Sequence, residues 1–185
     1  MKRLTITTAA ITLIASLANA FNITSPDGKL DVNIDLDSKG QPQYNVTLDG
    51  KTMLRNSPLG FTSNIGDYTK AKTMKPGEIT PIEENYSLDR IKKSDIEYHA
   101  NEATVKFVTP DGLKWGVTFR VSNNDVAFRY NISKAKETGS IYIDSESTGF
   151  RFPAGTTTFL TPQSDPMIGW KRTKPSYEEY YSVDA

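Results

Sequence analysis

Apolar and polar residues alternate along four segments of the chain. In Leu30–Leu36 every second residue is apolar, and the residues between them are aspartate or asparagine. The same alternation recurs in Tyr44–Leu48, Leu113–Val121 and Val126–Ile132. A period of two residues is typical of a strand with one buried and one solvated face. The pattern therefore predicts four half-buried strands.

The clearest of these strands lies at residues 113–121. Its apolar set is expected to point into the core, namely Leu113, Trp115, Val117, Phe119 and Val121. Its polar set is expected to face solvent, namely Lys114, Thr118, Arg120 and Ser122. The large side chains of the following strand should meet the apolar set on one face of a hairpin.

Turn motifs separate the predicted strands. Ser25–Gly28 and Thr109–Gly112 both end in Pro-Asp-Gly after a hydroxyl residue. Asp49–Gly50 is typical of a type I′ hairpin, because both positions tolerate a positive φ. This hairpin predicts a return strand at Lys51–Leu54, and Asn123–Asp125 is predicted to turn the chain again.

The remaining segments have weaker patterns. In Arg55–Pro81 the alternation fails and glycines and prolines are frequent. These residues interrupt regular elements, so we expect a long surface excursion there. Glu83–Asp89 could form a strand, whereas Ile91–His99 is ambiguous. Ile141–Glu146 and Gly149–Phe152 are predicted to be further short strands.

The distribution of these elements indicates the fold class. No segment beyond the first 20 residues shows a sustained period of about 3.6 residues, as a helix would. Many short strands, with turn signals roughly every 8–12 residues, are typical of packed antiparallel sheets. The sequence therefore predicts an all-β protein with the architecture of an antiparallel β-sandwich.

The first 20 residues have the composition of a secretory signal peptide. Lys2 and Arg3 form a positive start, Leu4–Leu17 is apolar and threonine-rich, and Ala18–Ala20 is a small-residue cleavage site. The apolar run is shorter than the roughly 20 residues that span a bilayer, which disfavours a membrane anchor. We predict cleavage after Ala20, export to the periplasm or the cell exterior, and a single domain at 21–185 without a membrane span.

Composition restricts the partners and the source of stability. The chain has 22 basic and 22 acidic residues, and removal of Lys2 and Arg3 leaves a net charge near −2. This balance is unlike that of a nucleic-acid-binding protein, and we expect no nucleic-acid partner. The chain has no cysteine, so its stability must come from a packed core rather than from disulfides.

No self-contained catalytic constellation is evident. His99 is the single histidine, and metal sites need several convergent ligands, so we interpret it as a surface or strand-edge residue. Phosphate-binding glycine loops and the Gly-x-Ser-x-Gly nucleophile motif are absent. The carboxylates of Asp31, Asp35 and Asp37 are expected to be solvated. We therefore predict no catalytic residue within this chain.

The last part of the chain concentrates aromatic and charged residues. Trp170 lies beside Lys171, and Glu178 and Glu179 follow Tyr177 and precede two further tyrosines. Aromatic rings offer flat faces on which sugar rings can stack, and carboxylates bind hard cations such as Ca²⁺. The alternative is a charged, solvated edge strand or linker. Composition leaves these two interpretations open.

Four segments, in order along the chain, resemble the N-terminal domain of glycoside hydrolase family 97, the α-glucosidase and α-galactosidase family. They are Ser25–Leu30, Ser57–Phe61, Asn124–Tyr130 and Pro166–Glu179. The resemblance covers nearly the whole chain after residue 20. It implies a β-super-sandwich of the galactose mutarotase type, followed in such proteins by a (β/α)8 catalytic barrel and a small C-terminal β-domain.

The resemblance also implies roles for the last part of the chain. Members of the family bind Ca²⁺ at the active site, with one glutamate ligand supplied by the N-terminal domain. Glu178 or Glu179 matches that ligand, and the resemblance does not decide between them. Trp170, Lys171 and Tyr177 are implied to face an oligosaccharide or α-glycoside substrate.

The preferred interpretation is the N-terminal portion of an exported α-glucosidase or α-galactosidase. The sandwich is expected to be incomplete at Ala185, and the catalytic barrel would be its partner in cis. The barrel would carry the catalytic carboxylates, so the fragment alone is expected to be inactive. The alternative is a stand-alone periplasmic carbohydrate-binding β-sandwich without catalysis. Glucoside or galactoside specificity, an inverting or retaining mechanism, and the oligomeric state are left open.

Overall fold

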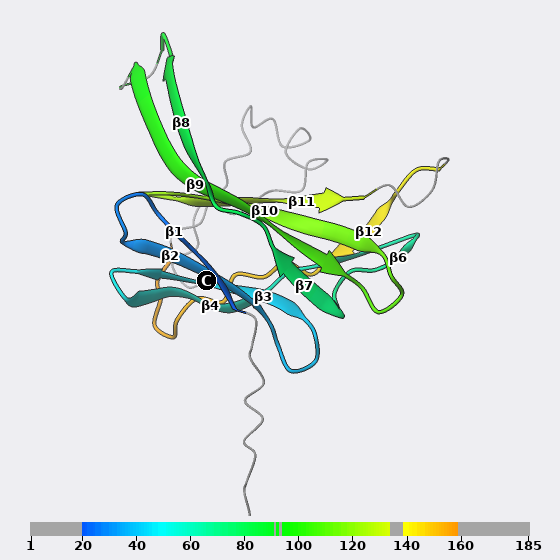
Figure 1. The fold of residues 1–185 in the computed structure, drawn as a ribbon. Helices are drawn as coiled ribbons and strands as arrows, with labels where there is room; N and C mark the ends of the chain where they lie inside the picture. The colour runs from blue at the N-terminus through cyan, green and yellow to red at the C-terminus, as the bar shows by residue number, and fades with distance from the viewer. Residues whose placement is uncertain (1–19, 91, 93, 134–138, 159–185) are drawn as a thin grey trace, which may run out of the picture. The chain divides into compact units, whose positions relative to one another are not determined.

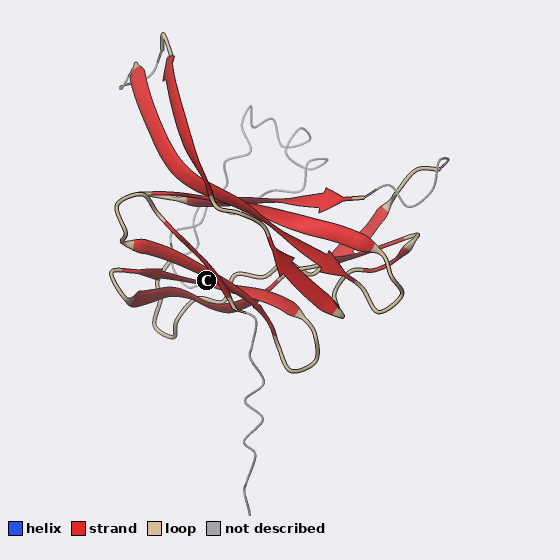
Figure 2. Ribbon diagram, viewed as in Figure 1, coloured by secondary structure: helices blue, strands red, loops and turns tan. Residues whose placement is uncertain are grey.

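The computed structural model describes residues 20–90, 92, 94–133 and 139–158, and this part of the chain contains strands but no helix (Figure 2). Its strands are β1 (Phe21–Thr24), β2 (Leu30–Leu36), β3 (Pro42–Leu48), β4 (Lys51–Pro58), β5 (Phe61–Ser63), β6 (Gly66–Asp67), β7 (Thr73–Pro76), β8 (Thr80–Ser87), β9 (Asp95–Val108), β10 (Lys114–Ser122), β11 (Val126–Ile132) and β12 (Ile143–Glu146). Their pairings are antiparallel. The all-β antiparallel fold predicted from the sequence is confirmed. Among the described residues, no helix is long and apolar enough to cross a bilayer.

The strands form two larger sheets and one small sheet. Strands β1-β2-β3-β4 make a four-stranded sheet, and β11-β10-β9-β7 make a second sheet in which β8 also pairs with β9. The third sheet has the order β12-β5-β6. Figure 1 shows the two larger sheets as stacked layers, which is the predicted β-sandwich.

The core fills the space between the facing sides of the two larger sheets. Val32 and Ile34 of β2 and Val117 and Phe119 of β10 have no exposed surface. The ring of Tyr44, on β3, lies 5.8 Å from that of Phe119 between centroids. Aromatic pairs at this spacing stabilise a core beyond the contribution of their buried area. The inward positions predicted for β2, β3 and β10 are confirmed.

The predicted turns are also confirmed. In both Pro-Asp-Gly turns the glycine N–H donates to the carbonyl oxygen of the first turn residue at 3.0 Å. Asp49 and Gly50 have φ angles of 49° and 75°, as a type I′ turn requires. The return strand β4 follows, and it continues past the predicted Leu54 to Pro58.

The predicted surface excursion at Arg55–Pro81 is wrong. The segment contains the end of β4, all of β5, β6 and β7, and the start of β8. Four of its apolar side chains are buried, namely Leu59, Phe61, Tyr68 and Ala71. Strands of two to four residues contain too few alternations to give a period-two signal. Pro58 and Pro76 lie on the edge strands β4 and β7, where a missing N–H is tolerated.

Two side chains of β10 were predicted to face solvent but are buried. Thr118 is 6% exposed and Ser122 is 5% exposed. Thr118 Oγ1 lies 2.7 Å from Thr104 Oγ1 and accepts a hydrogen bond from Asn131 Nδ2, also at 2.7 Å. Side chains of the two flanking strands therefore cover it. A central strand can be buried on both faces. The polar residues of its alternating pattern are then not the exposed ones.

Of the two short strands predicted near the end of the described region, one is confirmed. The first corresponds to β12, but Gly149–Phe152 forms only an isolated bridge between Arg55 and Arg151. Gly149 N donates to Pro58 O at 3.0 Å, and proline has no N–H to return to a ladder. A regular strand pairing therefore cannot continue there.

Strands β8 and β9 form a long hairpin. The strand predicted at Glu83–Asp89 corresponds to β8, and the ambiguous segment at Ile91–His99 contributes the first residues of β9. Figure 1 shows this hairpin rising away from the two layers.

Replacement of Phe119 by alanine is expected to lower the free energy of unfolding by about 3–5 kcal/mol, because a fully buried ring is lost and a cavity remains. Lys114→Ala, at an exposed position of the same strand, is the matched control and should change this quantity by less than about 0.5 kcal/mol. Urea unfolding followed by circular dichroism measures both. Equal stabilities of the two variants would contradict the assigned core.

Tyr44 is expected to make stability fall at alkaline pH. Burial raises the pKa of its hydroxyl to about 12, above the value of about 10 in an unfolded chain. The stabilisation is therefore complete below about pH 10 and is lost as the pH rises toward 12. The free energy of unfolding should fall by about 2 kcal/mol over this window, and less in Tyr44→Phe. Denaturation midpoints across the window test this, and parallel curves for the two proteins would refute it.

Candidate functional site

The predicted site residues lie outside the described residues. They all fall within 159–185, namely Trp170, Lys171, Tyr177, Glu178 and Glu179. The predicted signal peptide also lies outside them, except for its last residue. Their roles therefore stay predictions. The described residues show how the chain is held just before this region and which polar surfaces the sandwich presents.

The segment Ser147–Arg151, here called the stem, is held against β4. It follows β12 and precedes the part of the chain that carries the predicted site residues. Four hydrogen bonds of 2.8–3.0 Å join it to β4 and the next turn: Ser147 N to Gly60 O, Gly149 N to Pro58 O, Arg55 N to Arg151 O, and Arg151 N to Ser57 Oγ. The stem thus has a defined path although it is not a regular strand.

Two tyrosines of the core reach the stem with their hydroxyl groups. Tyr44 OH donates to Gly149 O at 3.2 Å. Tyr130 OH accepts a hydrogen bond from Gly60 N at 3.0 Å and makes another with Thr148 Oγ1. Burial raises the pKa of Tyr130, so its hydroxyl keeps its proton at neutral pH. The packed core is therefore connected directly to the stem.

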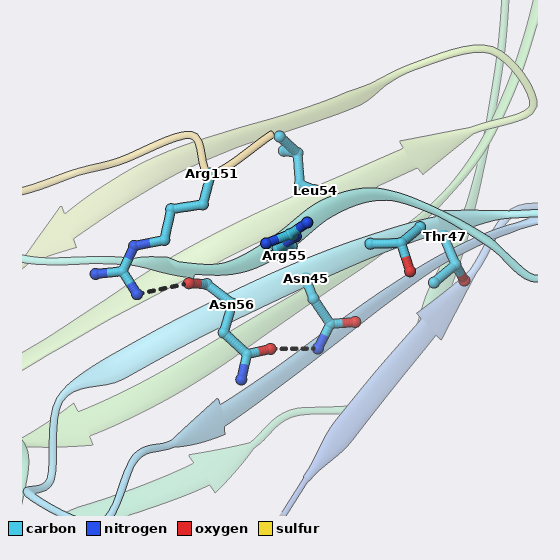
Figure 3. A pocket seen from close by; sticks show the side chains of 7 residues that line it. Asn45, Thr47, Leu54, Arg55, Asn56 and Arg151 are labelled. Carbon is cyan, nitrogen blue, oxygen red and sulfur yellow. Dashed lines mark hydrogen bonds between the residues drawn. The ribbon is translucent and has the colours of Figure 1, made fainter. Parts of the chain in front are cut away.

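A polar groove opens beside the stem (Figure 3). It has a volume of about 540 Å³ and is lined by Asn45, Thr47, Thr52, Leu54, Arg55, Asn56 and Arg151. Asn45 Nδ2 donates to Asn56 Oδ1 at 3.2 Å, and Arg151 Nη1 donates to Asn56 O at 3.1 Å. Side chains of β3 and β4 and one arginine of the stem therefore form a single surface.

The groove is suited to binding rather than to proton transfer. Its lining supplies amide, hydroxyl and guanidinium groups, and it contains no carboxylate or histidine. Neither Arg55 nor Arg151 has an ion-pair partner within the described part of the chain. General acid–base catalysis needs a group that exchanges a proton near neutral pH. The groove can accept a hydroxyl-rich or anionic ligand, but it has no such group.

The outer face of β9 and β10 carries an ion-pair cluster. Arg120 Nε lies 2.8 Å from Glu102 Oε2, and Arg120 Nη1 lies 3.5 Å from Glu84 Oε1. The hydrogen bond to Glu102 raises the pKa of Arg120. A groove of about 250 Å³ adjoins the cluster and is lined by Glu102, Thr118, Arg120, Ala127, Phe128 and Arg129. The partners are 18 and 36 residues apart, so no local sequence signal could have paired them.

The other predicted polar residues have structural roles or none. Asp31, expected to be solvated, is partly buried and accepts a hydrogen bond from Thr24 Oγ1 at 2.6 Å. Asp37 accepts two backbone N–H groups of the following turn, and Asp35 Oδ1 is buried. His99 is exposed on β9, as predicted. Within the described ranges, no three histidine, cysteine, aspartate or glutamate side chains converge as a metal site.

The chain matches the model of a known protein family. Residues 23–185 match the family described as Glycosyl-hydrolase 97 N-terminal. The chain is 26% identical over 170 residues to a probable retaining alpha-galactosidase of Streptomyces bingchenggensis, covering 83% of this chain and 26% of that protein. It is 25% identical over 189 residues to the retaining alpha-galactosidase of Bacteroides thetaiotaomicron, covering 100% of this chain and 27% of that protein. The chain thus spans about a quarter of the length of these relatives.

Solved structures agree with this match. The crystal structure of a beta-arabinopyranosidase is 48% identical and has a TM-score of 0.76, covering 89% of this chain and 26% of that one. A glycoside hydrolase family 97 enzyme from Pseudoalteromonas sp. strain K8, in complex with panose, is 26% identical with a TM-score of 0.62, covering 72% of this chain and 20% of that one. The resemblance noted in the sequence is confirmed, and the chain belongs to glycoside hydrolase family 97, in which it matches the N-terminal domain.

Proposed function

We propose that the chain is the N-terminal part of an exported retaining glycoside hydrolase that acts on galactose-configured sugars. The observation that carries this proposal is the 48% identity to a beta-arabinopyranosidase over 89% of the chain. The two relatives named as retaining alpha-galactosidases support it at lower identity.

Sugar stereochemistry explains how a beta-arabinopyranosidase and an alpha-galactosidase can act on the same class of sugar. β-L-Arabinopyranose has the ring configuration of α-D-galactopyranose and lacks only the C6 hydroxymethyl group. A site that hydrogen-bonds the axial O4 hydroxyl can therefore accept both sugars. It should discriminate against α-glucosides, in which O4 is equatorial, because a buried polar group of the site would lose its partner. The Pseudoalteromonas enzyme, which was solved with panose and with acarbose, is more distant at 26% identity.

The last part of the chain is proposed to supply the substrate-facing residues. Trp170 and Tyr177 would offer flat apolar faces to a sugar ring, and Lys171 would donate to a sugar hydroxyl. Glu178 or Glu179 would provide carboxylate oxygens, the ligand type that Ca²⁺ prefers. A Ca²⁺ ion held there would orient substrate hydroxyls and stabilise negative charge. The stem supports this proposal, because the hydrogen bonds to β4 fix the path of the chain that precedes these residues.

The catalytic carboxylates are proposed to lie in a barrel that follows in the same polypeptide. Hydrolysis of a glycoside uses two carboxyl groups that flank the scissile bond. The polar groove beside the stem has no carboxylate, and Glu102 is already paired with Arg120. The first 20 residues are proposed to direct the whole protein to the periplasm or the cell exterior. A stand-alone binding module would bind the same sugars without turnover.

The metal ligand can be identified in the full-length parent protein. We expect one of Glu178→Gln and Glu179→Gln to weaken Ca²⁺ binding, because a neutral amide replaces an anionic ligand. The same variant should lose activity. Isothermal titration with Ca²⁺ and hydrolysis rates measure the two effects. Glu83→Gln, on the exposed face of β8, is the matched control, and wild-type behaviour of both tail variants would refute the assignment.

The proposed specificity can be measured with aryl glycosides. The full-length parent should hydrolyse the α-galactoside and the β-L-arabinopyranoside with a kcat/KM at least about a hundredfold higher than that for the α-glucoside. The reason is that the α-glucoside has no axial O4 hydroxyl to bond the polar group of the site. A preference for the α-glucoside would contradict the proposed substrate class. Binding of all three sugars without release of the aryl group would instead indicate the stand-alone module.

A further inference from the structure

The hairpin of β8 and β9 extends beyond the sandwich as a two-stranded ribbon. The pairing of β10 with β9 ends at Ser122 and Ala100. Residues Asp95–His99 of β9 therefore pair only with Glu83–Ser87 of β8. Figure 1 shows this ribbon projecting from the layers. An isolated two-stranded hairpin is at best marginally stable in water, so we expect packing against another element to stabilise the ribbon.

The two faces of the ribbon differ in polarity. Tyr86 lies opposite Ile96, Glu84 opposite Tyr98, and Ile82 opposite Ala100, so this face is apolar except for one carboxylate. The other face carries Glu83, Asn85, Ser87, Asp95, Glu97 and His99. Tyr86 is 44% exposed, although an apolar face with a period of two is normally buried. The face formed by Ile82, Tyr86, Ile96 and Tyr98 is called the ribbon surface below.

The ribbon surface points away from the core of the sandwich. Asn101 Nδ2 donates to Thr24 O, on the opposite sheet, at 2.7 Å, so odd-numbered residues of β9 near this point face the first sheet. The even-numbered residues Tyr98 and Ile96 therefore lie on the outer side. Neither layer of the sandwich can cover this side.

The base of the ribbon surface is held by the ion-pair cluster. The guanidinium carbon of Arg120 lies 6.0 Å from the centre of the Tyr98 ring. The same side chain pairs with Glu84 of β8 and Glu102 of β9. The groove of about 250 Å³ next to Arg120 continues the surface across β10 and β11. This largely apolar strip carries one carboxylate, which pairs with Arg120, and a pre-positioned strip of this kind beside a groove is suited to receive a packed partner.

We propose that the ribbon surface packs against the part of the same polypeptide that follows this chain. The proposal rests on the proposed function only in requiring a further domain in cis. The chain spans 26–27% of its curated relatives, so a partner several times its own size would be covalently attached. Such a partner is present at an effective concentration on the order of millimolar, which lets a small contact suffice.

A second copy of the chain fits the ribbon surface less well. Stable interfaces bury roughly 800 Å² on each partner. A few partly exposed side chains supply on the order of 300–400 Å², the scale of the largest apolar patch on an ordinary monomer. An intermolecular contact of this size would be weak, whereas an intramolecular one does not have to overcome the loss of free translation.

Thiol labelling in the full-length parent tests the proposal. The chain has no cysteine, so Tyr86→Cys and Asn85→Cys each place one thiol on adjacent residues of opposite faces. Maleimide incorporation is measured relative to the unsubstituted parent. We expect labelling of Tyr86→Cys to be at least about tenfold slower than labelling of Asn85→Cys. Equal rates would show an uncovered ribbon surface and overturn the proposal.

Two further measurements separate the remaining outcomes. Protection at position 86 that disappears on dilution would assign the surface to a second copy and overturn the proposal. Hydrogen exchange of the unsubstituted parent covers the case of a misfolded variant: slow exchange at Glu83–Ser87 is expected, and exchange within seconds contradicts the packing. Glycoside hydrolysis is assayed on the same preparations, so a protected ribbon in an inactive protein would reject the proposed function alone.

Discussion

The burial of β10 between its neighbours is the constraint on which the rest of the sandwich depends. On its inner face Phe119 packs against Tyr44, and Trp115 packs edge-on against Phe61. These two contacts tie the larger sheet to β3 on one side and to the small sheet on the other. A slip of one residue would move Arg120 into the core and Phe119 out of it. The register of β10 is therefore strongly determined, and the registers of β9 and β11 follow from it.

The same core directs the path of the stem. Tyrosine can contribute an apolar ring to a core and a hydroxyl group to a polar partner at its edge. Tyr44 and Tyr130 both do this, and their hydroxyls reach Gly149 and Thr148. Loss of the Tyr130 hydroxyl would leave the Gly60 N–H without its partner, which costs about 1–3 kcal/mol if the group stays buried. Packing of the sandwich and placement of the stem are therefore coupled.

The fold class and the long strands could be predicted because each is encoded within a few neighbouring residues. The alternation in Leu30–Leu36 and the Asp49–Gly50 turn are local signals of this kind. Burial of Phe61 and Tyr68 could not be predicted, since it arises from contacts with Trp115 in another sheet. The pairing of Arg120 with two distant glutamates has the same origin.

The candidate site was predicted by a different route. Composition left Glu178, Glu179 and Trp170 open between a ligand site and a solvated edge, and only the family resemblance favoured the first. The family is confirmed over residues 23–185, whereas the roles of these residues stay predictions because they lie outside the described part of the chain. Likewise no alternation pattern indicated the groove beside the stem, because it combines strands β3 and β4 with an arginine far along the chain.

Three carboxylates of the sandwich have local structural roles. Asp27, Asp67 and Asp125 each accept a hydrogen bond from a serine or threonine no more than three residues away. The bond from Ser25 lowers the pKa of Asp27, whereas a proton donor near neutral pH needs a raised one. The sandwich therefore uses these acids to close turns. The proposed contacts with a second domain would use the stem and the ribbon instead. Both are held at their bases, the stem by tyrosine hydroxyls and the ribbon by Arg120. Rigid support of this kind is what the proposed shared site would require of a domain that contributes only part of it.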